Sequence, residues 1–246
     1  SDVYKRQTLF AASIKDIGWI TELCAKGRKG DTELRAGVTK LIENPLSRAE
    51  LKERAATALP DVPFWHVVRV AMESGHAVYS GADQLITPVD LPGLEETFNG
   101  DKVAATAELM TRYFRTHGPA TLHDFAWWAK LPQRLIRPAA ENLAPDIMRC
   151  GEVSQDLVSA EIVEMAEARK KQSVLLLGAF DEYILGYQDR LFAMTKEVHE
   201  VLVPGNRGVF RRAIVVDGQV RGTWNKQDIE DLSLIHISEP TRPLYI

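Results

Sequence analysis

The sequence contains only two cysteines, Cys24 and Cys150, which lie far apart in the chain. Two distant cysteines do not suggest a disulfide framework, and they suit a reducing cytoplasm. No apolar run approaches the roughly 20 residues that a membrane-spanning helix needs. Basic charge is also scarce, since 30 Lys and Arg face 34 Asp and Glu and the formal net charge is −4. A protein that coats nucleic acid non-specifically would be basic, so a nucleic-acid site in this chain must be a local basic patch.

Common catalytic signatures are missing as well. The sequence has no glycine-rich phosphate loop, no Gly-x-Ser-x-Gly elbow and no dinucleotide-binding fingerprint. The histidines before residue 232 are His66, His76, His117, His123 and His199, and their spacing is not typical of a zinc site. We therefore expect no cofactor, no metal site and no association with a membrane.

Both ends of the chain differ in character from the rest. Residues 1–7 and the segment that begins at Leu232 each back-translate, in one frame, to the ends of a common transposase-based library adapter. We interpret residues 1–7 and 232–246 as translated adapter, with a short disordered tail at each end as the alternative. On this interpretation the chain is an internal fragment that runs from about Thr8 to Asp231.

An imperfect internal repeat indicates two similar units. Pro-Leu-Ser-Arg-Ala-Glu at 45–50 aligns with Pro-Ala-Thr-Leu-His-Asp at 119–124. In the first stretch the Ser and the Glu three residues later form a capping box, and in the second the Thr and the Asp form a looser version. Each stretch therefore begins a helix. In each unit an amphipathic helix precedes this helix, and a third helix and a two-stranded hairpin follow it.

Three helices followed by a hairpin is the winged-helix plan. We therefore predict an α+β, mostly helical fold with winged-helix units at 31–92 and 93–160. Residues 8–30 would be the remnant of an earlier unit or a linker. Residues 161–231 would form a C-terminal strand and hairpin region that packs the units together.

The C-terminal region combines a core strand with a dense polar segment. Val174–Leu177 is uninterruptedly apolar and predicts a buried strand. Polar side chains follow within a few residues, namely Asp181, Glu182, Tyr183, Tyr187, Asp189 and Arg190. They can line a pocket in which carboxylates position a water or stabilise a sugar cation and tyrosines stack on a base. The alternative is structural, with an Asp-Arg salt bridge and tyrosine hydroxyls that satisfy the loop backbone.

Three separated blocks resemble the AlkZ-type winged-helix DNA glycosylases in order and spacing. They are Gly118–Trp128, Leu175–Arg190, and Val203–Asn206 together with the hairpin at 210–224, and the resemblance runs from about Thr8 to Lys226. It implies a monomeric, nucleoid-associated protein of the cytoplasm that binds damaged double-stranded DNA. Members of this family cut the N-glycosidic bond of alkylated bases and need no cofactor.

The resemblance also implies a catalytic signature, Gln-x-Gln or Gln-x-Asp, upstream of the stretch that resembles Thr8. Neither pattern occurs between Thr8 and Asp231. We therefore assign no catalytic residue to this chain and expect it to be inactive as a hydrolase.

Candidate DNA-binding residues fall in two groups. The helix after the turn of a helix-turn-helix normally enters the major groove, and in the second unit this helix carries Arg134 and Arg137, one turn apart on one face. The other group surrounds the last hairpin and consists of Arg207, Arg211, Arg212, Arg221 and Lys226. We expect a strand over Phe210–Val216, closed by Asp-Gly at 217–218 and pairing with 219–224, which would point Arg211 and Arg212 to opposite faces.

Each group also has a purely structural interpretation. The helix arginines can be a solvated face, and the hairpin cations can be a charged edge that discourages aggregation. The corresponding helix of the first unit offers only His66 and Arg69 and is expected to be scaffold. The alternative for the whole protein is a non-enzymatic winged-helix regulator, which predicts a dimerisation helix and a strongly basic recognition helix. The sequence has no dimerisation heptad and its net charge is negative, which favours repair.

Overall fold

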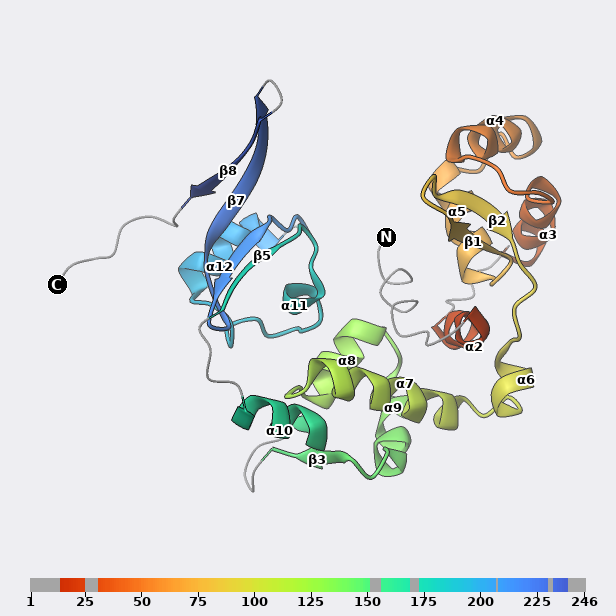
Figure 1. The fold of residues 1–246 in the computed structure, drawn as a ribbon. Helices are drawn as coiled ribbons and strands as arrows, with labels where there is room; N and C mark the ends of the chain where they lie inside the picture. The colour runs from red at the N-terminus through yellow and green to blue at the C-terminus, as the bar shows by residue number, and fades with distance from the viewer. Residues whose placement is uncertain are drawn as a thin grey trace. The chain divides into compact units, whose positions relative to one another are not determined.

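A computed structural model describes residues 14–24, 31–150, 156–168, 173–206, 208–229 and 232–238. Helices dominate the fold, and its sheets are small and antiparallel (Figure 1). The contacts divide the chain into two compact units. The first combines Ser1–Tyr113 with Ala129–Pro145, and the second combines Phe114–Trp128 with Asp146–Ile246.

The first unit opens with helices and a hairpin in the predicted order. Its elements are α2 (Ile14–Cys24), α3 (Asp31–Leu41), α4 (Arg48–Ala58), α5 (Phe64–Glu73), β1 (Ala77–Ser80) and β2 (Leu85–Pro88). The strands β1 and β2 are antiparallel, and β2 lies beside the helices in Figure 1. Gly75 follows the C-cap of α5 with a φ of 69°, a left-handed conformation that glycine adopts without strain.

Capping and burial explain why α3, α4 and α5 form. The predicted capping box is present, because Glu50 N donates to Ser47 Oγ and Ser47 N donates to Glu50 Oε2. The apolar faces of the three helices and the hairpin share one core, which includes Val38, Ile42, Leu51, Val67 and Ile86. Burial of these side chains supplies most of the stability of such short helices.

Helix α2 is part of the packed first unit. Its residues Trp19, Ile20 and Leu23 are buried. Glu22 accepts the main-chain N–H of Leu94, 2.7 Å away, at the start of α6 (Leu94–Phe98). The ring of Trp19 also meets that of Phe98 edge-on, with centroids 4.9 Å apart.

Gly18 in α2 gives a prediction whose sign is unusual. Gly18→Ala should lower the free energy of unfolding by about 1–3 kcal/mol, since a Cβ there would overlap the carbonyl oxygen of Pro92. In an open helix the same change stabilises by up to about 1 kcal/mol. Gly37→Ala in α3 is the matched control, because its Cβ would make ordinary contact with Leu59, 3.4 Å away. Urea unfolding measures both, and equal effects would contradict the packing described for α2.

The next elements have the order predicted from the second copy of the repeat. They are α7 (Lys102–His117), α8 (Leu122–Ala129), α9 (Gln133–Ala139), η1 (Ala140–Asn142), β3 (Ile147–Arg149) and β4 (Leu157–Ser159). The predicted cap of α8 is present, because Asp124 N donates to Thr121 Oγ1 and Thr121 N donates to Asp124 Oδ2, each at 3.0 Å. Pro138 is the sixth residue of α9. The helix ends one residue later, and Pro138 leaves the carbonyl of Arg134 without its usual intrahelical donor.

The C-terminal part contains a four-stranded sheet. Its elements are α10 (Ala160–Ala168), β5 (Val174–Leu177), α11 (Glu182–Leu185), α12 (Lys196–Leu202), η2 (Pro204–Asn206), β6 (Ala213–Val216), β7 (Gln219–Ile229) and β8 (Leu232–Ser238). The strand order is β5-β6-β7-β8, and every pair is antiparallel. Asp217 and Gly218 both have positive φ, as the predicted hairpin turn requires. Residues of β8 belong to the segment interpreted as translated adapter. Their pairing with β7 does not test that interpretation, which stays a prediction.

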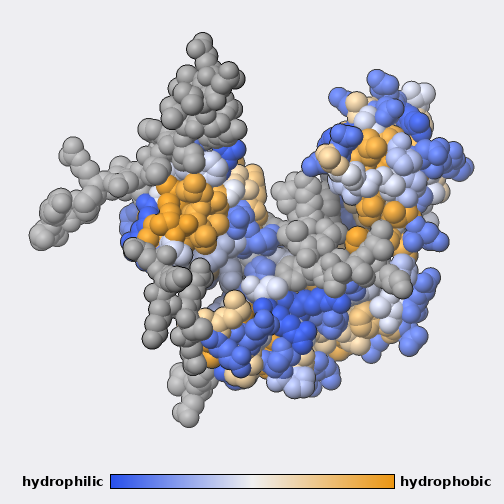
Figure 2. Space-filling view, in the orientation of Figure 1, coloured by the Kyte–Doolittle hydropathy of each residue, from blue (hydrophilic) through white to orange (hydrophobic). Residues whose placement is uncertain are grey.

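The structure corrects the prediction that Val174–Leu177 is buried. The strand forms, but Val174, Leu175 and Leu176 are 63%, 46% and 44% exposed. Among the strands that the structure describes, β5 is the outer one of its sheet and pairs only with β6. A continuous apolar run predicts burial of both faces, and it does not reveal whether other chain segments cover them. Figure 2 accordingly shows an apolar patch on the sheet in the region of β5.

Candidate nucleic-acid interface

Arg134 and Arg137 occupy the outer face of α9. Both side chains are exposed, whereas Leu135, Ile136 and Ala139 of the same helix are buried. Within the residues that the structure describes, neither arginine has an ion-pair partner. Two unpaired guanidinium groups one turn apart can each hold a phosphate or a guanine edge.

The cations around the last hairpin are arranged differently from the prediction. β6 begins at Ala213, so Arg211 and Arg212 lie in the segment before the strand and do not alternate across it. Both are exposed, and the guanidinium of Arg212 lies over the ring of Trp224 at 5.0 Å. Arg221 is exposed on β7. Arg207 and the side chain of Lys226 lie outside the described part of the chain.

Three of the predicted pocket residues serve the loops that contain them. Asp181 caps α11, and its Oδ1 accepts the N–H of Tyr183 at 3.0 Å. Asp189 accepts the N–H of Leu191 at 2.9 Å. Arg190 is buried, donates from Nε to the carbonyl of Ile184 and lies over the rings of Trp127 and Phe210. These atoms are therefore engaged by the protein itself.

The two tyrosine hydroxyls also donate to the main chain. Tyr183 Oη donates to the carbonyl of Gly218 at 2.6 Å, and Tyr187 Oη donates to the carbonyl of His117 at 2.7 Å. Burial raises the pKa of both hydroxyls above the ordinary tyrosine value, so both stay protonated and act as donors at neutral pH. This geometry favours the structural alternative for the tyrosines.

A polar cluster surrounds the half-buried Glu182, and the sequence singled out Glu182 without indicating its partners His117 and Trp128. Trp128 Nε1 donates to Glu182 Oε2 at 3.2 Å, and His117 Nε2 lies 3.7 Å from the same oxygen. Gly186 packs so closely that a Cβ there would overlap the His117 ring. Glu182 and its partners therefore join the end of α7 and α8 to α11.

Asp124 provides a second join between the same segments. Its Oδ2 accepts from Thr121 N and from Thr121 Oγ1, and its Oδ1 accepts from the main-chain N–H groups of Gln188 and Asp189. The sequence identified Asp124 only as a helix cap, because capping is a local pattern and the bonds to residues 188 and 189 are not.

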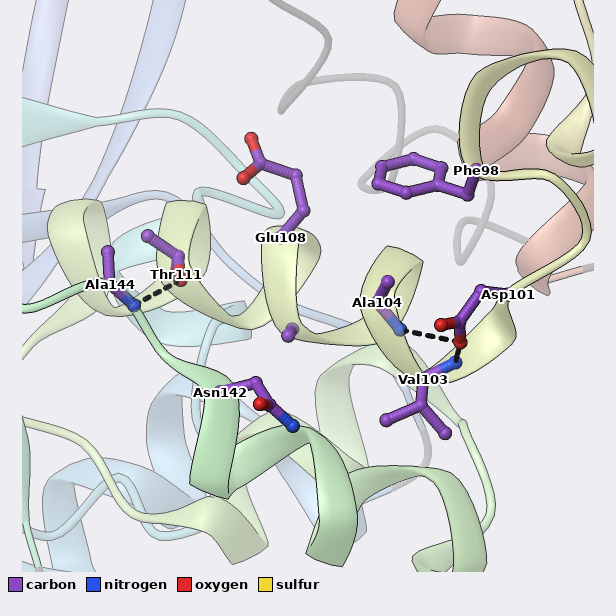
Figure 3. A pocket seen from close by; sticks show the side chains of 9 residues that line it. Phe98, Asp101, Val103, Ala104, Glu108, Thr111, Asn142 and Ala144 are labelled. Atoms are coloured by element: carbon purple, nitrogen blue, oxygen red, sulfur yellow. Dashed lines mark hydrogen bonds between the residues drawn. The ribbon is translucent and has the colours of Figure 1, made fainter.

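A cavity of about 470 Å³ lies in the first unit, and no predicted site residue lines it (Figure 3). It is lined by Phe98, Asp101, Val103, Ala104, Ala107, Glu108, Thr111, Asn142 and Ala144. Asp101 accepts the N–H groups of Val103 and Ala104, and Glu108 pairs with Arg112. Two carboxylates in its wall make this cavity unsuited to phosphate.

The described residues contain no group of His, Cys, Asp and Glu placed to hold a metal ion. None of the helices among them is long and apolar enough to cross a membrane.

An exposed pair of arginines on a helix that follows a turn is an arrangement that helix-turn-helix proteins present to DNA. The model of the AlkZ-like DNA glycosylases matches residues 3–242, and the chain belongs to this family. The resemblance drawn from the three sequence blocks is thereby confirmed. The matched range takes in part of both terminal segments, whose interpretation as adapter stays a prediction.

A solved structure supports the fold. The chain is similar to the Streptomyces sahachiroi DNA glycosylase AlkZ, with a TM-score of 0.63 and 17% sequence identity. The match covers 98% of this chain and 71% of that one. No curated protein matches the chain.

Proposed function

We propose that this chain binds damaged double-stranded DNA through α9, as part of a protein that excises alkylated bases. The observation that carries the proposal is the pair Arg134 and Arg137, exposed opposite the buried face of α9 and without ion-pair partners among the described residues. Membership of the AlkZ-like DNA glycosylases makes DNA the natural ligand for such a pair. We further propose that 31–92 and 93–160 are winged-helix units and that the protein acts as a monomer.

The hairpin cations are proposed to make separate contacts with the DNA backbone. Arg211, Arg212 and Arg221 are exposed and basic, and phosphate contacts need no more than a reachable cation. Arg207 and Lys226 join this proposed group by sequence alone. The role fits a chain of negative net charge, because the cations are concentrated around one hairpin.

The proposed reaction of the whole enzyme is hydrolysis of the N-glycosidic bond of an alkylated base. That chemistry needs a positioned water and a stabilised sugar cation. We assign neither role to Asp181, Glu182 or Asp189. Asp181 caps a helix. Glu182 accepts a hydrogen bond from Trp128, and Asp189 accepts one from the main chain of its own loop. The proposal for this chain is therefore recognition and binding, with no hydrolytic residue.

Binding to a fluorescent duplex, followed by anisotropy at several salt concentrations, tests this proposal. The logarithm of the observed binding constant should fall linearly with the logarithm of the salt concentration. The slope should be about −0.9 for each phosphate neutralised. The same duplex with one 7-methylguanine should bind more tightly than the undamaged form. Absence of duplex binding even at about 50 mM salt would overturn the proposed function.

A further inference from the structure

Phe180 is an aromatic residue in a strained and exposed position. It lies in the turn between β5 and α11 with a φ of 63°, and its side chain is 47% exposed. Bulky residues rarely adopt the left-handed region, since their Cβ crowds the backbone. Such outliers persist where the surrounding structure or a function maintains them.

The turn contains a glycine that does not occupy the strained position. Gly178 lies two residues earlier, and a Cβ there would meet open space. The positive φ falls on the phenylalanine, although glycine would adopt it without cost. The local backbone therefore does not explain why a large apolar ring stands at this position.

Core packing does not explain the ring either. Phe180 touches the ring of Phe210, with centroids 5.7 Å apart, and it is not among the buried residues of the sheet's core. Phe210 is itself buried and already has the guanidinium of Arg190 over it at 5.2 Å. Phe180 thus lies at the outer end of an aromatic and cationic stack, with about half of its surface accessible.

The chemistry around this ring suits nucleic acid. The residues that follow Phe210 are the exposed Arg211 and Arg212. The one carboxylate next to Phe180 in sequence, that of Asp181, is engaged with the N–H of Tyr183. Accessible aromatic rings together with exposed arginines are the usual means by which proteins stack on bases while holding phosphates.

We propose that Phe180 stacks on an unstacked nucleobase of bound DNA, with Arg211 and Arg212 on the neighbouring phosphates. The inference rests on the proposed DNA binding and adds the residue that contacts a base. An aromatic face stacks on any base, so this contact favours DNA in which a base has already left the helix.

Three substitutions of Phe180 separate stacking from packing. Phe180→Leu keeps apolar bulk without a π face, and it should weaken binding to a duplex with one bulged base by roughly tenfold. Phe180→Trp should retain the affinity. Phe180→Gly should weaken binding as Leu does while leaving the thermal midpoint unchanged or higher, because glycine relieves the strain. Asn99→Gly is the backbone control, since Asn99 also has positive φ, and it should not alter binding.

The outcomes distinguish this inference from the function on which it rests. If the unaltered chain binds no DNA, the proposed function fails. If it binds DNA and Phe180→Leu binds the bulged duplex equally well, only the stacking role is overturned. A large fall in the thermal midpoint of Phe180→Gly, with full affinity in Phe180→Leu, would make Phe180 a packing residue.

Discussion

Replacing Arg134 and Arg137 together by alanine should weaken duplex binding by roughly 30-fold or more and reduce the salt slope by about 2. Both side chains are exposed and lie on the face of α9 opposite its buried residues, so their removal leaves the core intact. The loss should therefore appear in affinity, and the unfolding midpoint should not change. Anisotropy against salt measures both quantities.

Arg35→Ala with Lys40→Ala is the matched control for this double change. Both residues are exposed on α3, and the substitutions remove the same charge. This pair should leave the salt slope within about 0.5 of the original, because it makes no phosphate contact. Equal losses in the two double variants would mean that net charge, and not α9, governs binding.

Asp124→Ala should have the largest effect on stability, a loss of about 3–5 kcal/mol in the free energy of unfolding. The buried carboxylate accepts four hydrogen bonds, and its removal leaves the main-chain N–H groups of Thr121, Gln188 and Asp189 without this acceptor. Urea unfolding of the whole chain measures the change.

Asp189→Ala is the matched control for Asp124, since its exposed carboxylate accepts one bond from the neighbouring loop. It should cost less than about 1 kcal/mol. Comparable losses in the two variants would contradict the account of Asp124 as the joint between α8 and the loop after α11.

The features that the sequence predicted correctly depend on neighbouring residues. The capping boxes at Ser47 and Thr121 and the turn at Asp217 and Gly218 are set by side chains a few positions apart. The cap of α12 is local in the same way, since the side chain of Thr195 accepts the N–H of Val198. Local hydrogen bonding and turn chemistry are written in short patterns, and distant contacts do not overrule them here.

The errors concern distant contacts. Val174–Leu177 looked buried because its composition is apolar, but burial depends on what lies over an outer strand. Arg211 and Arg212 precede the strand because Ala213 is where pairing with β5 begins. Tyr183 and Tyr187 donate to carbonyls 35 and 70 residues away in sequence, which no periodicity indicates.

The candidate site was predictable only in part for the same reason. The exposure of Arg134 and Arg137 on one face of α9 could be predicted, because helical spacing places them on one face and apolar neighbours on the other. Phe180 could not be found, since neither positive φ nor exposure of a phenylalanine is encoded in a short pattern. Glu182 was singled out for its polarity, and its bond to Trp128 became visible only in the folded chain.

Photo-crosslinking tests the central claim most directly. The unaltered chain is irradiated on a duplex that carries 5-iodouracil next to an alkylated base, and the crosslinked peptides are identified by mass spectrometry. The account predicts crosslinks in three peptides. One carries α9, one contains Phe180 and one contains Arg211. Crosslinks confined to α2, α3 and α4, with none in α9, would contradict it.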